Sequence, residues 1–230
     1  MKRIIILFFT CLSIISYAQD HSQTEEYGSY EAPIPIELMV GNKWLMFQNI
    51  ISKNFGKNDQ FNYFNLVNYE VNHKRNDNEG SHGANQEASY IVQSIFSYNL
   101  TQHFSLGAGA NLKAFGGFNP IIAGQYTHFS RNFGLVLQPS FEFGETRIAE
   151  LFALLEWYPD IQKSWQPYFS IQGASNLATA TREHEFSYMN SRLGIQYKNI
   201  RLGAAINSRF IGENFMDEWN TGAFFSILIH

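Results

Sequence analysis

The feature that most constrains the fold of this chain is a period-two alternation of apolar and polar residues, repeated in segments of about ten to fourteen residues. Residues 104–115 separate an apolar face from a face of small and polar side chains, and residues 133–144, 165–176 and 200–210 do the same. Successive side chains of a β-strand point to opposite faces. The pattern therefore predicts long strands, each with one apolar and one polar face.

Residues 147–158 can be read in two ways, because their sequence is RIAELFALLEWY. Alanine, leucine and glutamate are good helix formers, so propensity alone predicts a helix. With a period of two, one face is wholly apolar and the other carries Glu150 and Glu156. Since the neighbouring segments alternate in the same way, we predict a strand, with both carboxylates on one face.

Short turns separate these segments and indicate hairpins between antiparallel neighbours. The tightest turns are at residues 101–103, 116–117, 130–132 and 198–199, and the longest connection, residues 72–86, is polar and loop-like. The order of strand and turn thus favours an up-and-down arrangement.

The sequence predicts an all-β protein, an antiparallel transmembrane up-and-down β-barrel of twelve strands, with ten strands as the alternative because the first strand is short. The predicted strands 44–53 and 61–72 alternate poorly, so a bulge or a wrong placement stays open for both. The predicted strands cover residues 34–41, 44–53, 61–72, 88–99, 104–115, 118–129, 133–143, 147–158, 165–176, 184–197, 201–211 and 219–229.

The first eighteen residues have the composition of a secretory signal peptide. Lys2 and Arg3 precede an apolar run over residues 4–15, and a small-x-small motif ends at Ala18, after which we expect cleavage. A retained membrane anchor is the alternative, although the run is short for a helix that spans a bilayer. We expect a flexible lead-in over residues 19–33 and the folded body over 34–230.

Composition narrows the possible chemistry of the mature chain. The sole cysteine, Cys11, lies in the predicted signal peptide, so neither disulfides nor thiol catalysis are expected after cleavage. Removal of Lys2 and Arg3 leaves 14 basic and 20 acidic residues, and this excess of acid argues against a nucleic-acid partner. Past the signal peptide no run of 18 apolar residues occurs, so membrane-spanning helices are not expected either.

Two features favour a membrane barrel over a soluble, secreted β-sandwich or barrel that binds a ligand. The predicted strands reach the ~9–11 residues that a spanning strand needs, whereas ordinary strands centre on ~5–6. Their polar faces consist of Gly, Ser, Asn, Gln and Tyr with sparse charges, which is typical of a barrel lumen. Aromatic residues near strand ends suit the girdles of a membrane–water boundary; they include Phe129, Phe133, Trp157, Tyr158, Trp165, Tyr168 and Tyr197.

On these residues the chain resembles the small outer-membrane β-barrel proteins of bacteria with two membranes, over residues 34 to 230. The resemblance rests on the signal peptide, the dyad pattern, the cysteine-free body and the last strand at 221–230, TGAFFSILIH. It implies contact with outer-membrane lipid and with the barrel-assembly machinery during biogenesis. Such chains often finish on an aromatic residue, whereas this one ends in His230.

The resemblance also implies a topology. Both termini would face the periplasm, with the short turns near Thr101, Arg131 and Asn199. The connections at residues 72–86 and 177–183, together with 212–218, would be extracellular.

The inward faces of the predicted strands carry a charged and polar network. Acidic residues fall on one wall and guanidinium groups on another, which leaves three interpretations open. Either the network forms salt bridges that fill a narrow barrel, or separated charges line a constriction that selects solutes; a lumenal ligand site for a small solute is a third. The predicted lumen residues are Glu142, Glu150, Glu156, His184, Asn190, Arg192, Arg201 and Arg209.

No catalytic motif stands out, so we expect no enzyme. Some outer-membrane barrels are lipid-modifying hydrolases, and their nucleophile needs a base on the same face. His128 and Ser130 have that spacing but lie beside a turn and have no evident third member, while His184 and Ser187 are three apart and fall on opposite faces. A lipid-modifying enzyme is therefore the alternative to a non-catalytic barrel, which would be a narrow pore or a structural or accessory protein.

No metal or other cofactor is expected. His73, Glu79 and His82 share one loop but lack the fixed spacing of metal ligands.

Overall fold

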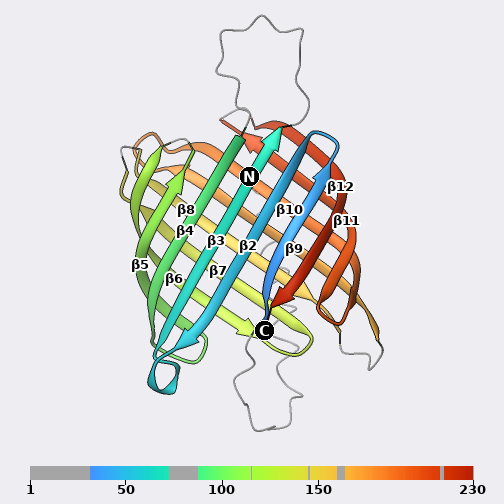
Figure 1. Cartoon of the computed structure of the whole chain (residues 1–230). Coiled ribbons are helices and arrows are strands. Elements are labelled where there is room, and N and C mark those ends of the chain that lie inside the picture. Colours follow the sequence, from blue (N-terminus) through green and yellow to red (C-terminus); the bar gives the residue numbers. More distant parts are fainter. Residues whose placement is uncertain are drawn as a thin grey trace, which may run out of the picture. The chain divides into compact units, whose positions relative to one another are not determined.

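The computed structural model describes residues 32–72, 88–114, 116–144, 146–159, 164–212 and 215–229. These residues form a closed barrel of twelve strands in which every strand pairs with its neighbours in sequence and β12 pairs with β1 (Figure 1). All the pairings are antiparallel, so the predicted fold is confirmed and the ten-stranded alternative is wrong. The predicted signal peptide and nearly all of the lead-in lie outside the described residues.

The observed strands differ from the predicted ones only at their ends. The connection between β2 and β3 contains a short 3-10 turn, η2 (Lys57–Asp59). The strands are β1 (Ile34–Gly41), β2 (Trp44–Phe55), β3 (Phe61–Asn72), β4 (Ala88–Asn99), β5 (Phe104–Lys113), β6 (Gly117–Phe129), β7 (Phe133–Glu142), β8 (Ile148–Trp157), β9 (Trp165–Ala178), β10 (Glu183–Tyr197), β11 (Ile200–Ile211) and β12 (Met216–Ile229).

The two ends of the barrel differ in the chain termini and connections that lie there. At the terminal end, Ile34 of β1 pairs with Ile229 of β12, and the hairpin turns at residues 100–103, 130–132 and 198–199 lie there too. We call the opposite end, where β1 passes to β2, the loop end. In Figure 1 the terminal end is the lower one, because β12 runs downward to the C-terminal mark.

The seam between β1 and β12 closes the barrel. Its register runs without a break from Ile34 opposite Ile229 to Gly41 opposite Gly222. The short first strand, whose existence the sequence supported least, is thus the one that removes the free edges of the sheet. Closure satisfies the backbone hydrogen bonds of both terminal strands, which hydrocarbon could not do.

A β-bulge interrupts the pairing of β10 with β9. His184 lies opposite Leu177, whereas Phe186 lies opposite Asn176, so the register shifts between His184 and Phe186. An extra residue in one strand reverses the alternation of faces beyond it. His184 therefore lies on the face of Leu177, which is the outer face.

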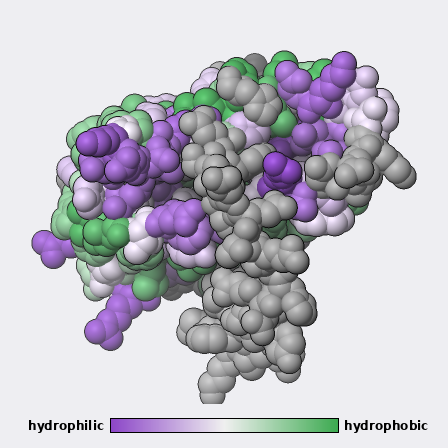
Figure 2. All heavy atoms as spheres, turned by 90° about the horizontal axis from the view of Figure 1, so that it is seen from below, coloured by the Kyte–Doolittle hydropathy of each residue, from purple (hydrophilic) through white to green (hydrophobic). Residues whose placement is uncertain are grey.

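The outer face of the barrel is apolar along the middle of its strands. Leu193 and Phe96 expose 66% and 62% of their surface. Figure 2, viewed from the terminal end, shows hydrophobic residues along the sides of the barrel and hydrophilic residues over much of the end face. The exposed apolar side chains of this belt include Leu38, Val40, Leu106, Ile122, Leu151, Ile171, Ile195, Leu202, Ile206, Phe225 and Ile227.

The inner side contains an apolar cluster as well as polar residues. This interior cluster explains why β2 and β3 alternate poorly in sequence, because Ile50, Phe64 and Leu66 take up inward positions among polar residues. Both strands pair without a break from Trp44–Asn72 to Phe55–Phe61. The predicted bulge or misplacement is therefore wrong. The interior cluster consists of Ile50, Phe64, Leu66, Ile95, Ile121, Ala123, Val136, Phe152, Leu154 and Ala174.

Within the described ranges, no helix is long and apolar enough to cross a membrane.

Candidate functional site

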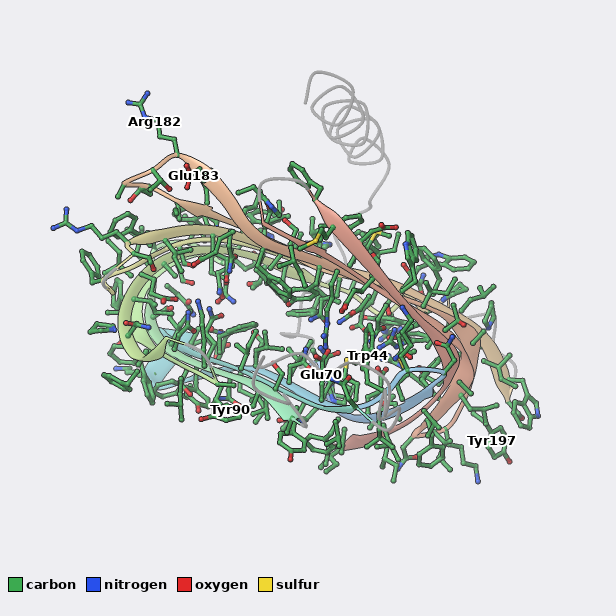
Figure 3. All side chains as sticks on the ribbon, turned by 90° about the horizontal axis from the view of Figure 1, so that it is seen from above. Trp44, Glu70, Tyr90, Arg182, Glu183 and Tyr197 are labelled. Atoms are coloured by element: carbon green, nitrogen blue, oxygen red, sulfur yellow. The ribbon has the colours of Figure 1, made fainter. Side chains whose placement is uncertain are left out.

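The interior of the barrel holds nearly all of the charged and polar residues singled out from the sequence. One exception is His184, which the bulge places on the outer face and not in the lumen as predicted. Seen from the loop end, the wall is flattened, and Trp44 and Glu70 lie in the interior while Tyr197 lies outside (Figure 3). The predicted residues found on the inner side are Glu142, Glu150, Glu156, Asn190, Arg192, Arg201 and Arg209.

Near the terminal end, Arg201 of β11 reaches across to Glu156 of β8. The Arg201 Nη1 to Glu156 Oε1 distance is 2.9 Å, and the Tyr168 hydroxyl donates to the same oxygen at 2.8 Å. The guanidinium carbon lies 4.1 Å from the centroid of the Tyr168 ring. The Arg201 Nε donates to the side chain of Gln196 at 2.8 Å. This buried ion pair is held by hydrogen bonds on both partners, the condition under which such a pair is tolerated.

Further along the lumen, Arg192 of β10 pairs with Glu37 of β1. The Arg192 Nε to Glu37 Oε1 distance is 2.8 Å, and Nη1 donates to the Asn207 side chain at 2.8 Å. Arg192 is almost completely buried, and the Asn207 amide in turn reaches the sulfur of Met46. The pair fixes the inner side of β10 to the closing seam.

At the loop end, Arg209 of β11 forms an ion pair with Glu70 of β3. The same guanidinium lies 3.9 Å from a carboxylate oxygen of Glu218 on the neighbouring strand, and its carbon lies 4.2 Å from the centroid of the Trp44 ring. Strands β11 and β3 are not neighbours in the sheet, so this contact also crosses the interior.

A second group at the loop end is centred on Glu142 of β7. Lys113 Nζ and Asn111 Nδ2 of β5 lie 2.5 and 2.9 Å from Glu142 Oε2. Glu150 of β8 accepts a hydrogen bond of 3.4 Å from Gln93 of β4. Every carboxylate predicted in the lumen is therefore in contact with a hydrogen-bond donor.

The acids and bases are thus paired and not held apart on separate walls. Among the interpretations that the sequence left open, this geometry favours salt bridges that fill the barrel over a constriction of separated charges. Three ion-pair partners were missing from the predicted lumen residues, namely Glu37, Glu70 and Lys113. Glu70 lies in a strand whose weak alternation hid its face, but the alternation of β1 and of β5 could have placed Glu37 and Lys113 on the inner side.

Apolar and amide side chains close the space between these ionic groups. The rings of Phe64 on β3 and Phe152 on β8 meet edge to face, with centroids 5.8 Å apart. Gln138 of β7 donates to Gln93 of β4 at 2.6 Å and accepts from Gln125 at 3.2 Å. Since β3 and β8 belong to opposite parts of the ring of strands, the two walls touch through the lumen.

A larger and a smaller cavity lie in the described part of the interior. The larger, about 800 Å³, lies toward the loop end and is lined by ionic side chains such as Lys113, Glu142 and Arg209 together with the aromatic Tyr188. The smaller, about 50 Å³, lies between Glu37, Arg192 and the interior cluster. We call the larger one the loop-end vestibule. It has room for a small solute, whereas the smaller one has room for little more than ordered water.

A polar group that the sequence did not predict lies on the outer face around His184. His184 Nε2 lies 2.7 Å from the Ser187 hydroxyl oxygen, and its Nδ1 lies 2.9 Å from the carbonyl oxygen of Gly212. Ser187 lies opposite Ser175 on β9, with 3.0 Å between the hydroxyl oxygens. The imidazole stacks on the ring of Phe215 at 4.2 Å. Because of the bulge, His184 and Ser187 share a face, which corrects the prediction that they lie on opposite faces.

The other histidine–serine candidate does not form a pair of this kind. The Ser130 hydroxyl donates to the carbonyl of Phe133 at 3.1 Å. The His128 ring instead packs against His103, with centroids 5.1 Å apart. The described residues contain no group of three or more His, Cys, Asp or Glu side chains placed to hold a metal ion, and the candidate loop with His73 and His82 lies outside them.

An apolar outer belt around a polar, side-chain-filled interior defines the class of this chain as a β-barrel of the membrane-spanning type. Searches with protein-family models and among curated proteins found no match. Among solved structures, LpxR from Salmonella typhimurium is similar with 7% identity and a TM-score of 0.46, over 85% of this chain and 99% of that chain. The KdgM porin is similar with 12% identity and a TM-score of 0.45, over 86% and 99%.

The outer membrane protein opdK from Pseudomonas aeruginosa is more distant, with 8% identity, a TM-score of 0.37, and coverage of 76% of this chain and 64% of that chain.

Proposed function

We propose that this chain is an integral outer-membrane β-barrel that does not conduct solutes, with a closed lumen and a vestibule at its loop end. The observation that carries the proposal is the contact between opposite walls inside the barrel, seen in the Phe64–Phe152 ring pair. Of the roles that the sequence left open, this contact supports a structural or accessory barrel over a narrow pore.

The membrane setting is supported by the two faces of the wall. Outward apolar side chains on every part of the ring would be costly in water but are favourable against lipid tails. Inward ionic groups such as Arg192 and Arg201 are nearly fully buried and paired, as polar groups inside a membrane protein must be. The closed ring of strands leaves no unpaired sheet edge toward the hydrocarbon. An exported chain with this construction fits the outer membrane, whose lipid it would contact directly.

Contacts at three levels along the barrel axis support a closed lumen. The Arg201–Glu156 pair crosses it near the terminal end, the interior cluster fills the middle, and the Arg209–Glu70 pair crosses it at the loop end. A continuous water path would require several of these contacts to open together. The vestibule above the cluster stays accessible to a small polar solute without leading through the barrel.

Bilayer recordings test the proposal. We expect the purified mature chain, folded in detergent and inserted into a planar bilayer, to produce no discrete conductance steps, because its lumen is filled. A general diffusion porin inserted under the same conditions serves as the positive control. Insertion is verified separately by the shift in gel mobility between unheated and boiled proteoliposomes. Steady single-channel openings from inserted protein would contradict a closed lumen.

A further inference from the structure

We propose that Ser187 and His184 form a catalytic pair on the outer face of the barrel that hydrolyses the acyl ester bond of a membrane lipid. The sequence analysis set this pair aside because regular alternation would place the two residues on opposite faces. The bulge between His184 and Phe186 removes that premise.

The hydrogen bonds of His184 fix the state in which it can act as a base. Its Nδ1 faces the carbonyl oxygen of Gly212 at 2.9 Å, and a carbonyl can only accept, so Nδ1 carries a proton. In the neutral ring Nε2 then has a free lone pair, and it faces the Ser187 hydroxyl at 2.7 Å. A base that is itself oriented by a third group, here the backbone of Gly212, is the arrangement that activates a serine nucleophile.

The surroundings of the ring hold it in place. The imidazole stacks on Phe215 with an interplanar angle of 21°, and the Gly212 carbonyl also accepts the backbone N–H of Phe215. The Ser187 hydroxyl has one proton and two acceptors within reach, His184 Nε2 and, at 3.0 Å, Ser175 Oγ. Ser175 is therefore beside the nucleophile, where its own hydroxyl can donate to an oxygen that becomes negative during the reaction.

The location of the pair points to lipid as the substrate. Leu177 and Met189, which flank it on the outer face, and Phe215 are exposed apolar side chains. A 15-residue strand such as β10, at ~3.3 Å per residue and a tilt of ~40°, rises about 38 Å, whereas the apolar band of such barrels is ~25 Å tall. Ser187 lies about 10 Å below the loop end of β10 on the same geometry, near the edge of that band. Ester carbonyls of membrane lipids lie at this boundary between hydrocarbon and headgroups.

The reaction balances with water as the only co-reactant. The Ser187 oxygen attacks the ester carbonyl carbon while its proton passes to His184 Nε2, and Ser175 donates a hydrogen bond to the resulting oxyanion. The bond between the carbonyl carbon and the lipid alcohol then breaks, and the alcohol leaves with the proton from His184. Water attacks the acyl-serine, gives one proton to His184, and releases the fatty acid as Ser187 recovers its hydrogen. The products are one fatty acid and one lipid with a free hydroxyl.

The test combines lipid turnover with covalent labelling of the protein folded in detergent. Two substrates distinguish the lipid source: vesicles of diacyl phospholipid and vesicles that contain lipopolysaccharide. We expect free fatty acid from at least one of them and none from ether-linked phospholipid, which has no acyl ester. A fluorophosphonate probe should add its mass to the peptide that contains Ser187.

Variants separate catalysis from folding. Ser187→Ala and His184→Asn should both reduce fatty acid release to the rate without protein and abolish labelling, and Ser175→Ala should lower the turnover rate about a hundredfold. Ser191→Ala is the matched control, because Ser191 lies on the same outer face of β10 outside the pair; it should keep both signals. Each variant is first checked for its heat-modifiable gel mobility. A folded parent that releases no acid from either substrate and takes up no probe would overturn the proposal, as would unchanged turnover in Ser187→Ala.

Discussion

Replacement of Arg201 by alanine is expected to lower the free energy of unfolding by about 3–5 kcal/mol, the range for removing one partner of a buried ion pair. The Arg201 side chain is 4% exposed and that of Glu156 14% exposed, so the remaining carboxylate would stay in the interior without its cation. The guanidinium also packs on Tyr168 and bonds Gln196, and both contacts would be lost. The effect is measured as the shift of the urea unfolding midpoint in detergent, followed by tryptophan fluorescence.

Two comparisons identify the cause of this loss. Arg131→Ala removes an exposed arginine in a terminal-end turn and should change stability by no more than about 0.5 kcal/mol. The double variant with Arg201→Met and Glu156→Gln should recover much of the loss, because it leaves no isolated charge. If Arg201→Ala and Arg131→Ala unfold at the same urea concentration, the ion pair does not stabilise the barrel.

Replacement of Gly222 by alanine is expected to prevent closure of the barrel. Gly222 lies opposite Gly41 in the seam between β12 and β1, and a Cβ atom there would overlap the carbonyl oxygen of Val40 and the Cα of Gly41. Overpacking typically costs about 1–3 kcal/mol where side chains can move aside. Here the atoms in the way belong to the backbone, so the expected cost is above that range and the folded band on unheated gels should be lost.

Gly124→Ala is the matched control for this substitution. Gly124 is also a strand glycine, but a Cβ atom there would make an ordinary contact of 3.5 Å with the side chain of Leu106. This variant should fold with the yield of the parent. A normal yield of folded Gly222→Ala would show that the seam is less tightly packed than its register implies.

Much of the barrel could be predicted from the sequence, because the apolar belt and the small or polar inner face impose a strict period of two. The prediction was strongest from Phe104 onward, where the inward positions are mostly polar, and weakest in β2 and β3. There Met46, Ile50 and Phe64 point inward among polar residues, so the two faces differ less and the period weakens. When apolar side chains fill part of a lumen, the apolar–polar alternation that identifies the inward face of a strand is weakened.

The candidate sites were predictable to a lesser degree. The inward direction of Glu156 and Arg201 follows from their place in an alternating strand, but their contact depends on how two distant strands face each other across the barrel. The bulge before Phe186 has no marker such as glycine or proline in the local sequence, EHEFS. For that reason the regular alternation of faces predicted His184 in the lumen and hid its contact with Ser187.

The seam has a kinetic consequence. It joins the two ends of the described chain, and Asn220 secures it by accepting from the backbone N–H of Lys43 at 2.8 Å and donating to the carbonyl of Trp44 at 3.0 Å. Contacts between residues so far apart in sequence raise the contact order and slow folding. Until β12 pairs with it, β1 presents an unpaired edge to any other extended chain. Because the seam needs both ends of the described chain, we expect its closure to be the last step of barrel folding.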